Sequence, residues 1–300
     1  MEPKLSIVVA MKDGASNVQA LLDALKDRDG DTEVILCCAG PVLDLAVGDP
    51  LPIQFSFPTE TLAPSLWSEG ILRARGTRVA LTTGQFVPTA DWLERLRAAD
   101  LDRWVGIGGA IDNDPASSAR NWAIFFLRYS AFAPPLAAGE TNEIAADNAV
   151  YDRAAILEHA GLLHEGFWEP SFHRRFRAAG RRLALDPELV VVHHGTVSAQ
   201  NFAFQRYLHG RAYGIERAER ASFGRNLLLL MSSPLVAPLL LARIVTRIAR
   251  RPRYRDMLLK SAPWLVRFTF AWAKGESFGY ASTLFAPRRN VAAASSKRHA

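Results

Sequence analysis

The stretch VALTTGQFVPTADWL, residues 79–93, passes from a short apolar run through a polar turn into the beginning of a helix. The apolar and β-branched residues at 78–83 favour a buried strand, and a Thr-Gly-Gln turn follows at 83–85. The Asp-Trp-Leu sequence then opens a helix predicted over 89–100. A strand, a turn and a helix in this order form a repeating unit of α/β proteins.

The same alternation extends along most of the chain. Short apolar runs bounded by turn residues predict strands at 5–11, 33–38, 52–57, 78–83, 105–110 and 189–195. Helical spacing of apolar residues and helix start and stop residues predict helices at 15–27, 65–75, 89–100, 119–132, 152–161, 170–180 and 198–220. Strands and helices in alternation predict a mostly parallel, doubly wound sheet flanked by helices. We assign this α/β domain to residues 1–222.

The composition is that of a globular protein. The chain has 300 residues, of which 49% are hydrophobic and 22% charged. Its two cysteines, Cys37 and Cys38, are adjacent, and neighbouring residues do not easily form an unstrained disulfide. A reducing, cytoplasmic environment is therefore expected. The apolar run near the N-terminus is too short for an export signal, and we interpret it as the first strand.

Charge is unevenly distributed along the sequence. Residues 1–224 contain 22 basic and 28 acidic side chains, a net charge of −6, whereas residues 225–300 contain 14 basic and 2 acidic ones, a net charge of +12. The positive charge lies among apolar residues and not along an aromatic-studded groove, which argues against nucleic-acid binding. A mildly acidic body with a basic, apolar tail fits a protein held against an anionic membrane surface.

Two apolar stretches make up that tail, at 226–242 and 261–275. The first is slightly shorter than a membrane span needs and contains two prolines, and the second is interrupted by Arg267. Both suit helices that lie in the membrane interface, so we expect residues 223–300 to form a helical, membrane-associating segment. The expected location is peripheral, on the cytoplasmic face of the inner membrane. A buried helical pair is the alternative.

Ligands of doubly wound sheets bind beyond the carboxyl ends of the strands. The polar residues predicted there are Lys12, Asp13, Thr83, Gln85 and His193, followed by His194. One carboxylate among a cation, an amide and imidazoles makes a polar pocket, but a poor site for a hard metal ion, which prefers several anionic oxygens. We therefore predict no metal ligand and no cofactor.

Four segments carry a resemblance to a known family. They are LSIVVAMKDGASNVQALLDAL (5–25), EVILCCAG (33–40), WSEGILRARGTRVAL (67–81) and ADNAVYDRAAILEHAGLLHEGFWEPSFHRRFRAAGRRLALDPELVVVHHG (146–195). Their order and spacing, more than any single motif, resemble the family 2 glycosyltransferases of the Rossmann-like GT-A fold. The resemblance covers about residues 4–220. It implies transfer of a sugar from a nucleotide donor to an acceptor hydroxyl.

The sequence departs from that family at its best-known positions. The uracil-contacting aspartate of the family falls at Cys38, and its metal-binding Asp-x-Asp falls at residues 83–85. The acidic pair that supplies the acceptor base falls at Glu169-Pro170. The resemblance therefore implies a divergent, metal-independent member. Preorganised cations would then stabilise the departing diphosphate, and Lys12, Arg73, Arg75 and the two histidines are available.

The resemblance also implies roles for individual residues. Glu169 would be the catalytic base, and Asp147 and Asn148 would bind the acceptor. The donor would be bound by Lys12, Asp13, Cys38, Thr83, Gln85 and His193. Structural interpretations stay open, because Glu169 also suits a helix N-terminus, residues 147–148 suit a turn, and His193 suits a buried strand end.

Two functions follow from this sequence. The first is a hexosyltransferase that uses a lipid-linked or polysaccharide acceptor. The second is a catalytically inactive homologue that binds a sugar or nucleotide, or acts as a scaffold for other polysaccharide-synthesis proteins at the membrane. A lipid- or nucleic-acid-binding protein is a weaker third hypothesis. An enzyme should lose turnover when Glu169 is changed, whereas a scaffold should tolerate the change.

Overall fold

The computed structural model describes residues 3–12, 17–26, 30–45, 51–195 and 197–285. The chain forms two compact units. Residues 1–121 and 128–196 make the α/β unit, and residues 122–127 and 197–300 make the helical unit. The division near residue 196 differs from the predicted domain boundary at 222, because the helix at 199–219 packs with the tail helices.

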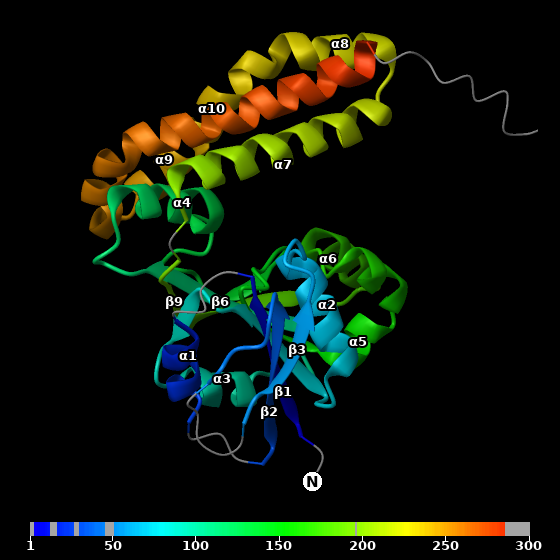
Figure 1. Ribbon diagram of the computed structural model, residues 1–300, viewed down its shortest axis with the longest axis vertical. Coiled ribbons are helices and arrows are strands. Elements are labelled where there is room, and N and C mark those ends of the chain that lie inside the picture. Colours follow the sequence, from blue (N-terminus) through cyan, green and yellow to red (C-terminus); the bar gives the residue numbers. More distant parts are fainter. Residues whose placement is uncertain (1–2, 13–16, 27–29, 46–50, 196, 286–300) are drawn as a thin grey trace, which may run out of the picture. The chain divides into compact units, whose positions relative to one another are not determined.

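A nine-stranded sheet is the framework of the α/β unit (Figure 1). Its strands are β1 (Leu5–Met11), β2 (Thr32–Ala39), β3 (Ile53–Phe57), β4 (Arg78–Thr83), β5 (Phe86–Pro88), β6 (Gly106–Asn113), β7 (Gly139–Thr141), β8 (Asn148–Asp152) and β9 (Leu183–His193). The strand order is β3-β2-β1-β4-β8-β6-β9-β5, and β7 also pairs with β9. The predicted α/β class is confirmed.

The sheet is more mixed than expected. Strands β1 to β4 pair in parallel, as do β6 and β9, but β8 runs antiparallel between β4 and β6. Strand β8 was not predicted, since it begins within the polar pair Asp147-Asn148, which is typical of a turn. The strand predicted at 189–195 begins six residues after the first residue of β9, Leu183. In the first part of β9, Pro187 interrupts the apolar pattern, and the register between β6 and β9 shifts beside Gly109.

Helices flank this sheet (Figure 1). They are α1 (Val18–Ala24), α2 (Ala63–Arg73), α3 (Trp92–Ala98), α5 (Arg153–Leu157), the short 3-10 helix η2 (Ala160–Glu165) and α6 (Glu169–Ala178). Helix α4 (Ala119–Tyr129) has its residues 122–127 in the helical unit. Helix α2 buries Leu66, Trp67 and Ile71 in the core, and the Trp67 indole donates a 2.7 Å hydrogen bond to the Thr82 carbonyl. This contact fixes α2 against the end of β4.

At the amino edge of the sheet, a buried carboxylate joins β1, β2 and the end of α2. Glu33 accepts hydrogen bonds from the Ser6 hydroxyl at 2.7 Å and from the Arg75 guanidinium at 2.7 and 2.9 Å. Arg75 therefore lies at the edge opposite to the carboxyl ends, so it is not placed to stabilise a diphosphate there. Arg73 is also engaged, in an ion pair with Glu69 and stacked over the Phe55 ring.

The helical unit consists of α7 (Ala199–Glu219), α8 (Phe223–Ser232), η3 (Ser233–Leu235), α9 (Val236–Ala249), η4 (Pro252–Tyr254), α10 (Arg255–Phe285) and residues 122–127 of α4. The rings of Trp122, Phe125 and Phe126 gather around Tyr254 at centroid distances of 5.7 to 6.3 Å. These four rings attach the α4 segment to the tail helices.

Helices α7 and α10 lie side by side and run in the same direction (Figure 1). Each carries two glycines four residues apart, Gly210 and Gly214 on α7 and Gly275 and Gly279 on α10. A Cβ added to any of the four would come within 2.0 to 2.5 Å of a carbonyl oxygen of the other helix. The two backbones are thus in direct contact, which only glycine permits.

One helical stretch of this unit, Phe223–Ala249, is long and apolar enough to cross a membrane by length and composition. It has 27 residues, and its most apolar 18 residues have a mean hydropathy of 2.0, so it is longer than the apolar run at 226–242 indicated. One such stretch is a weak indication of membrane association, because core helices of soluble proteins meet the same test.

The glycine contact predicts that a methyl group added at this contact destabilises the fold, whereas one added elsewhere in the helical unit does not. Gly275→Ala should lower the free energy of unfolding by about 1–3 kcal/mol, because the Cβ would meet the Tyr207 carbonyl oxygen at 2.0 Å. Gly224→Ala, in α8 of the same unit, is the control, since a Cβ there meets nothing within 4 Å. It should be neutral or slightly stabilising. Denaturant unfolding of both variants measures the difference, and equal effects would contradict the packing argument.

Candidate active site

The carboxyl edge of the sheet gathers side chains from distant parts of the sequence. Strands β1, β4, β6 and β9 all end there, whereas β8 begins there because it is antiparallel to β4 and β6. Lys12 follows the end of β1, and Asp147 precedes the beginning of β8. Both residues therefore lie at this edge of the sheet. Most of the predicted site residues lie along it.

Glu169 begins α6 at this edge and is half-buried. Its Oε1 accepts a hydrogen bond from the Ala146 N–H at 3.3 Å, which ties α6 to the segment before β8. Burial raises the pKa of Glu169 to about 7, and the negative charges of Asp147 and, more weakly, Glu143 add to the rise. Near neutral pH this carboxyl group can both accept and release a proton.

Asp147 is the second carboxylate of the pair. Its Oδ1 accepts a hydrogen bond from the Tyr129 hydroxyl at 3.3 Å. Burial raises the pKa of Asp147 to about 6, although the positive charge of Arg128 and the Tyr129 hydrogen bond both oppose this rise. Two neighbouring carboxyl groups with raised pKa values at a sheet edge are typical of functional sites.

Tyr129 links this pair to His193. The two rings lie 5.6 Å apart, and the Phe86 ring packs against both, at 5.5 Å from Tyr129 and 5.4 Å from His193. The His193 Nδ1 lies 3.0 Å from Oδ1 of Asn113. Burial lowers the pKa of His193 to about 3, helped by the charges of Arg128 and His194. The imidazole is therefore neutral at physiological pH and supplies no positive charge to a diphosphate.

The turn at residues 83–85 closes over β9. The Gly84 N–H donates to the Ala10 carbonyl at 3.2 Å, and the Gln85 carbonyl accepts from the His194 N–H at 2.8 Å. Thr83 and Gln85 are both buried. A Cβ on Gly195 would lie 2.5 Å from Nε2 of His193 and 2.8 Å from Oε1 of Gln85. Glycine at 195 thus lets the backbone pass directly over these two groups.

The other residues predicted to bind the sugar donor are Lys12, Cys38 and Asp13. Lys12 is half-buried, and its Nζ donates to the Thr61 carbonyl at 3.1 Å. Cys38 is only 2% exposed, and burial raises the pKa of its thiol. It therefore presents no charged group to the base of a nucleotide. Asp13 lies outside the described residues.

Asn148 has a different role from the predicted one. Its side chain is fully buried, with Oδ1 accepting from the Trp92 indole at 2.8 Å and Nδ2 donating to two carbonyls, of Ala110 at 2.9 Å and of Leu189 at 2.8 Å. This amide is engaged by the protein on both ends. We therefore assign Asn148 to the support of the site, not to the binding of an acceptor.

Sequence reasoning missed four side chains at this edge. Asn113 contacts His193, Asp114 lies 3.3 Å from Nδ1 of His194, and Tyr129 and Arg128 face Asp147. The first two follow the predicted strand at 105–110, so the polar run Asp-Asn-Asp after it was a usable signal. No sequence pattern separated Tyr129 and Arg128 from the rest of a helix.

The residues at the turn do not fit a divalent metal ion. Residues 83–85 offer a hydroxyl and an amide where the resembled family has two carboxylates. Asp114 is already paired with His194. Across the described part of the chain, no group of three or more His, Cys, Asp or Glu side chains is arranged to hold a metal.

Comparisons with known proteins add little. No family model matches the chain, and no curated protein matches it. Among solved structures, a mannosyltransferase from Pyrobaculum calidifontis in complex with GDP-Man and Mn2+ is similar over 95% of this chain and 88% of its own, with 15% identity and a TM-score of 0.48. A likeness at this level carries no conclusion about activity.

The raised pKa of Glu169 predicts a pH-dependent stability difference. A carboxyl group whose pKa rises from 4.5 to about 7 on folding stabilises the folded state at low pH, and this contribution is lost as the pH increases through that range. Relative to Glu169→Gln, the wild type should therefore lose about 1–2 kcal/mol of unfolding free energy between these pH values, after allowing for solvent screening. Denaturant unfolding at several pH values measures this. A difference that does not vary with pH would contradict the assignment, and exposed Glu165→Gln is the control for removing one charge.

Proposed function

We propose that the α/β unit is a glycosyltransferase, which moves a sugar from a nucleotide donor to a hydroxyl group of a lipid-linked or polysaccharide acceptor. The observation that carries the proposal is Glu169, a half-buried carboxyl group at the carboxyl edge of the sheet, with a pKa raised to about 7 beside Asp147. The mixed α/β sheet and the order of segments resembling family 2 glycosyltransferases support it.

In this proposal Glu169 is the general base. It takes the proton of the acceptor hydroxyl while the acceptor oxygen forms a bond to the anomeric carbon of the donor sugar. The bond from that carbon to the diphosphate breaks, and its electron pair leaves with the nucleoside diphosphate. A single displacement of this kind inverts the anomeric configuration. Asp147 raises the basicity of Glu169 by its charge, and the Tyr129 hydroxyl holds Asp147 in place.

Negative charge develops on the departing diphosphate and needs a positive or hydrogen-bonding partner. We propose Arg128 for this role in place of the neutral His193. The positive charge of Arg128 acts on Asp147, Tyr129 and His193, so it faces the cluster that contains the base. Lys12 is the second cation at this edge and would act at the β1 side. No step of the proposal passes through a divalent ion.

The helical unit would hold the enzyme near its acceptor. We propose that it lies peripherally on the cytoplasmic face of the inner membrane, where lipid-linked acceptors are found, together with other polysaccharide-synthesis proteins. The apolar stretch Phe223–Ala249 and the net charge of +12 over residues 225–300 support contact with an anionic membrane surface.

A second candidate function is a catalytically inactive subunit. It is favoured by the absence of carboxylates at Cys38 and at residues 83–85, where the resembled family contacts the uracil base and the metal. A protein without these groups would keep a sugar- or nucleotide-binding surface, or act only as a scaffold. The enzyme should lose turnover when Glu169 is changed, whereas the inactive subunit should tolerate the change.

The enzyme proposal predicts that Glu169→Gln lowers kcat by about 10²–10⁴-fold with little change in KM for the donor. The amide cannot accept the hydroxyl proton but occupies the same volume. Transfer of labelled sugar from a panel of sugar nucleotides to a membrane lipid extract measures the rate. Glu165→Gln, which removes an exposed charge four residues earlier, is the matched control. Unchanged turnover in Glu169→Gln would refute the role of the base, and no turnover by the wild type with any donor would favour the inactive subunit.

A further inference from the structure

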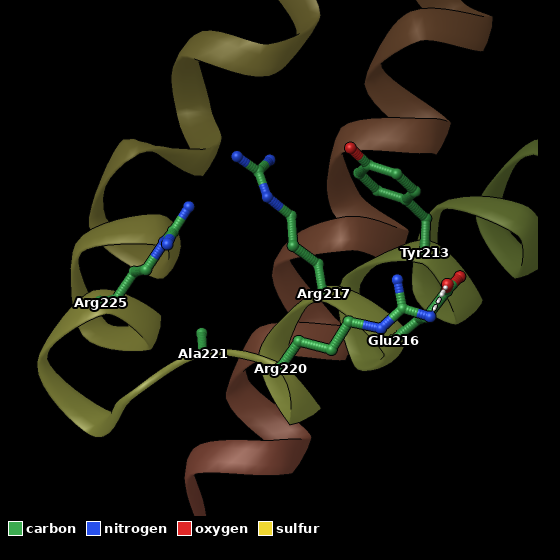
Figure 2. Close-up of a pocket in the computed structure, with 6 residues that line it drawn as sticks. All are labelled: Tyr213, Glu216, Arg217, Arg220, Ala221 and Arg225. Carbon is green, nitrogen blue, oxygen red and sulfur yellow. Dashed lines mark ion pairs between the residues drawn. The ribbon is translucent and has the colours of Figure 1, made fainter. Parts of the chain in front are cut away.

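The end of α7 and the beginning of α8 form a pocket of about 310 Å3 in the helical unit. Its lining consists of Tyr213, Glu216, Arg217, Arg220, Ala221 and Arg225. Figure 2 shows the side chains of Arg217 and Arg225 extending into the space between α8 and α10, whereas Arg220 turns toward Glu216. Guanidinium groups from two different helices therefore face the same space.

Arg217 is held in place by a buried carboxylate behind it. Its Nη1 donates a 3.3 Å hydrogen bond to the Tyr280 hydroxyl and lies 3.9 Å from Oε1 of Glu276. Glu276 is only 3% exposed, and it accepts hydrogen bonds from the Tyr280 hydroxyl at 2.6 Å and from the Trp272 indole at 2.9 Å. Both of these Arg217 contacts use the same nitrogen. Within the described part of the chain, its Nε and Nη2 are therefore left to donate to a ligand in the pocket.

The charges of the pocket are not fully balanced by the protein. Arg220 pairs with Glu216 at 2.9 Å, one turn earlier on α7. The buried Glu276 offsets the charge of Arg217. Arg225 is exposed on the first turn of α8 and has no hydrogen bond or ion pair with a described residue. Three arginines thus stand against two carboxylates, and an anion bound between Arg217 and Arg225 would balance the remaining charge.

We propose that this pocket binds a phosphate group of a phosphomonoester or a diphosphate, with Arg217 and Arg225 as the residues that contact it. A guanidinium group donates two parallel hydrogen bonds, so a pair of them suits a phosphate with three or more oxygens better than a carboxylate with two. The site lies wholly in the helical unit. The inference therefore goes beyond the proposed sugar transfer and does not depend on it.

The phosphate belongs either to a membrane lipid or to a soluble molecule. Exposed apolar side chains lie on α8 near Arg225, since Phe223 is 64% exposed and Leu228, one turn after Arg225, is 67% exposed. Acyl chains of a lipid would contact these residues while the head group occupies the pocket. A soluble phosphate would use the same two arginines without the apolar contact.

The test offers both sources of phosphate to the full-length protein at constant ionic strength. Inorganic pyrophosphate is titrated in a calorimeter. Phosphatidylcholine vesicles with phosphatidic acid are compared with vesicles in which phosphatidylglycerol gives the same surface potential. The pocket variant is Arg225→Gln, and the matched control is Arg267→Gln, which removes one charge from an exposed position of α10 outside the pocket. Circular dichroism checks that both variants keep their helices.

Arg225→Gln should weaken phosphate binding about tenfold, whereas Arg267→Gln should change it less than about twofold. Pyrophosphate binding that is weakened in this way would identify a soluble ligand. A preference for phosphatidic acid over phosphatidylglycerol that is weakened in the same way would identify a lipid. Both results support the site. Equal effects of the two substitutions, or no binding of either probe by the wild type, would overturn the proposal.

Arg217→Lys tests the geometry of the site separately. Lysine keeps a positive charge beside Glu276 but cannot donate two parallel hydrogen bonds to a phosphate. The variant should therefore bind the same probe about threefold more weakly, or worse, although the net charge is unchanged. Binding as tight as that of the wild type would contradict the role of Arg217.

Discussion

The α/β unit depends on the side-chain amide of Asn148. This one group connects the beginning of β8 to β6, β9 and α3 through hydrogen bonds to Ala110, Leu189 and Trp92. A buried amide that lost these partners would leave polar atoms unsatisfied, at a cost of about 1–3 kcal/mol for each. Space for the amide exists because residue 109 is glycine, where a Cβ would lie 2.4 Å from Nδ2 of Asn148. The antiparallel strand β8 is held between β4 and β6 in this way.

The candidate site follows from that constraint. Fixing Asn148 also fixes Asp147 and Ala146, and Ala146 donates to Glu169. Burial then acts on neighbouring groups in opposite directions, since it raises the pKa of the two carboxyl groups and lowers that of His193. The edge thus carries a proton acceptor and a neutral imidazole, with Arg128 as a nearby positive charge. This is the arrangement from which we infer acid–base chemistry at a hydroxyl group.

Much of this fold was predictable from sequence, because the strands at 5–11 and 78–83 and the helix at 198–220 have clear apolar patterns and clear ends. The antiparallel β8 was not, because its support comes from a buried amide that the sequence alone does not distinguish from a turn residue. Among the site residues, Glu169 was predicted as the base from the resemblance at residues 146–195, and its role stays a prediction. The neutral state of His193 and the contributions of Tyr129 and Arg128 arise from packing between distant segments, which periodicity does not report.

Binding of the donor tests the central claim most directly. Purified full-length protein is titrated in a calorimeter with a panel of nucleoside diphosphates and sugar nucleotides, with and without magnesium or manganese. We expect one sugar nucleotide to bind with the same affinity in the presence and absence of the metal, because residues 83–85 provide no carboxylate for it. Absence of binding across the whole panel would contradict the glycosyltransferase proposal. Binding that requires the metal would contradict our account of the turn.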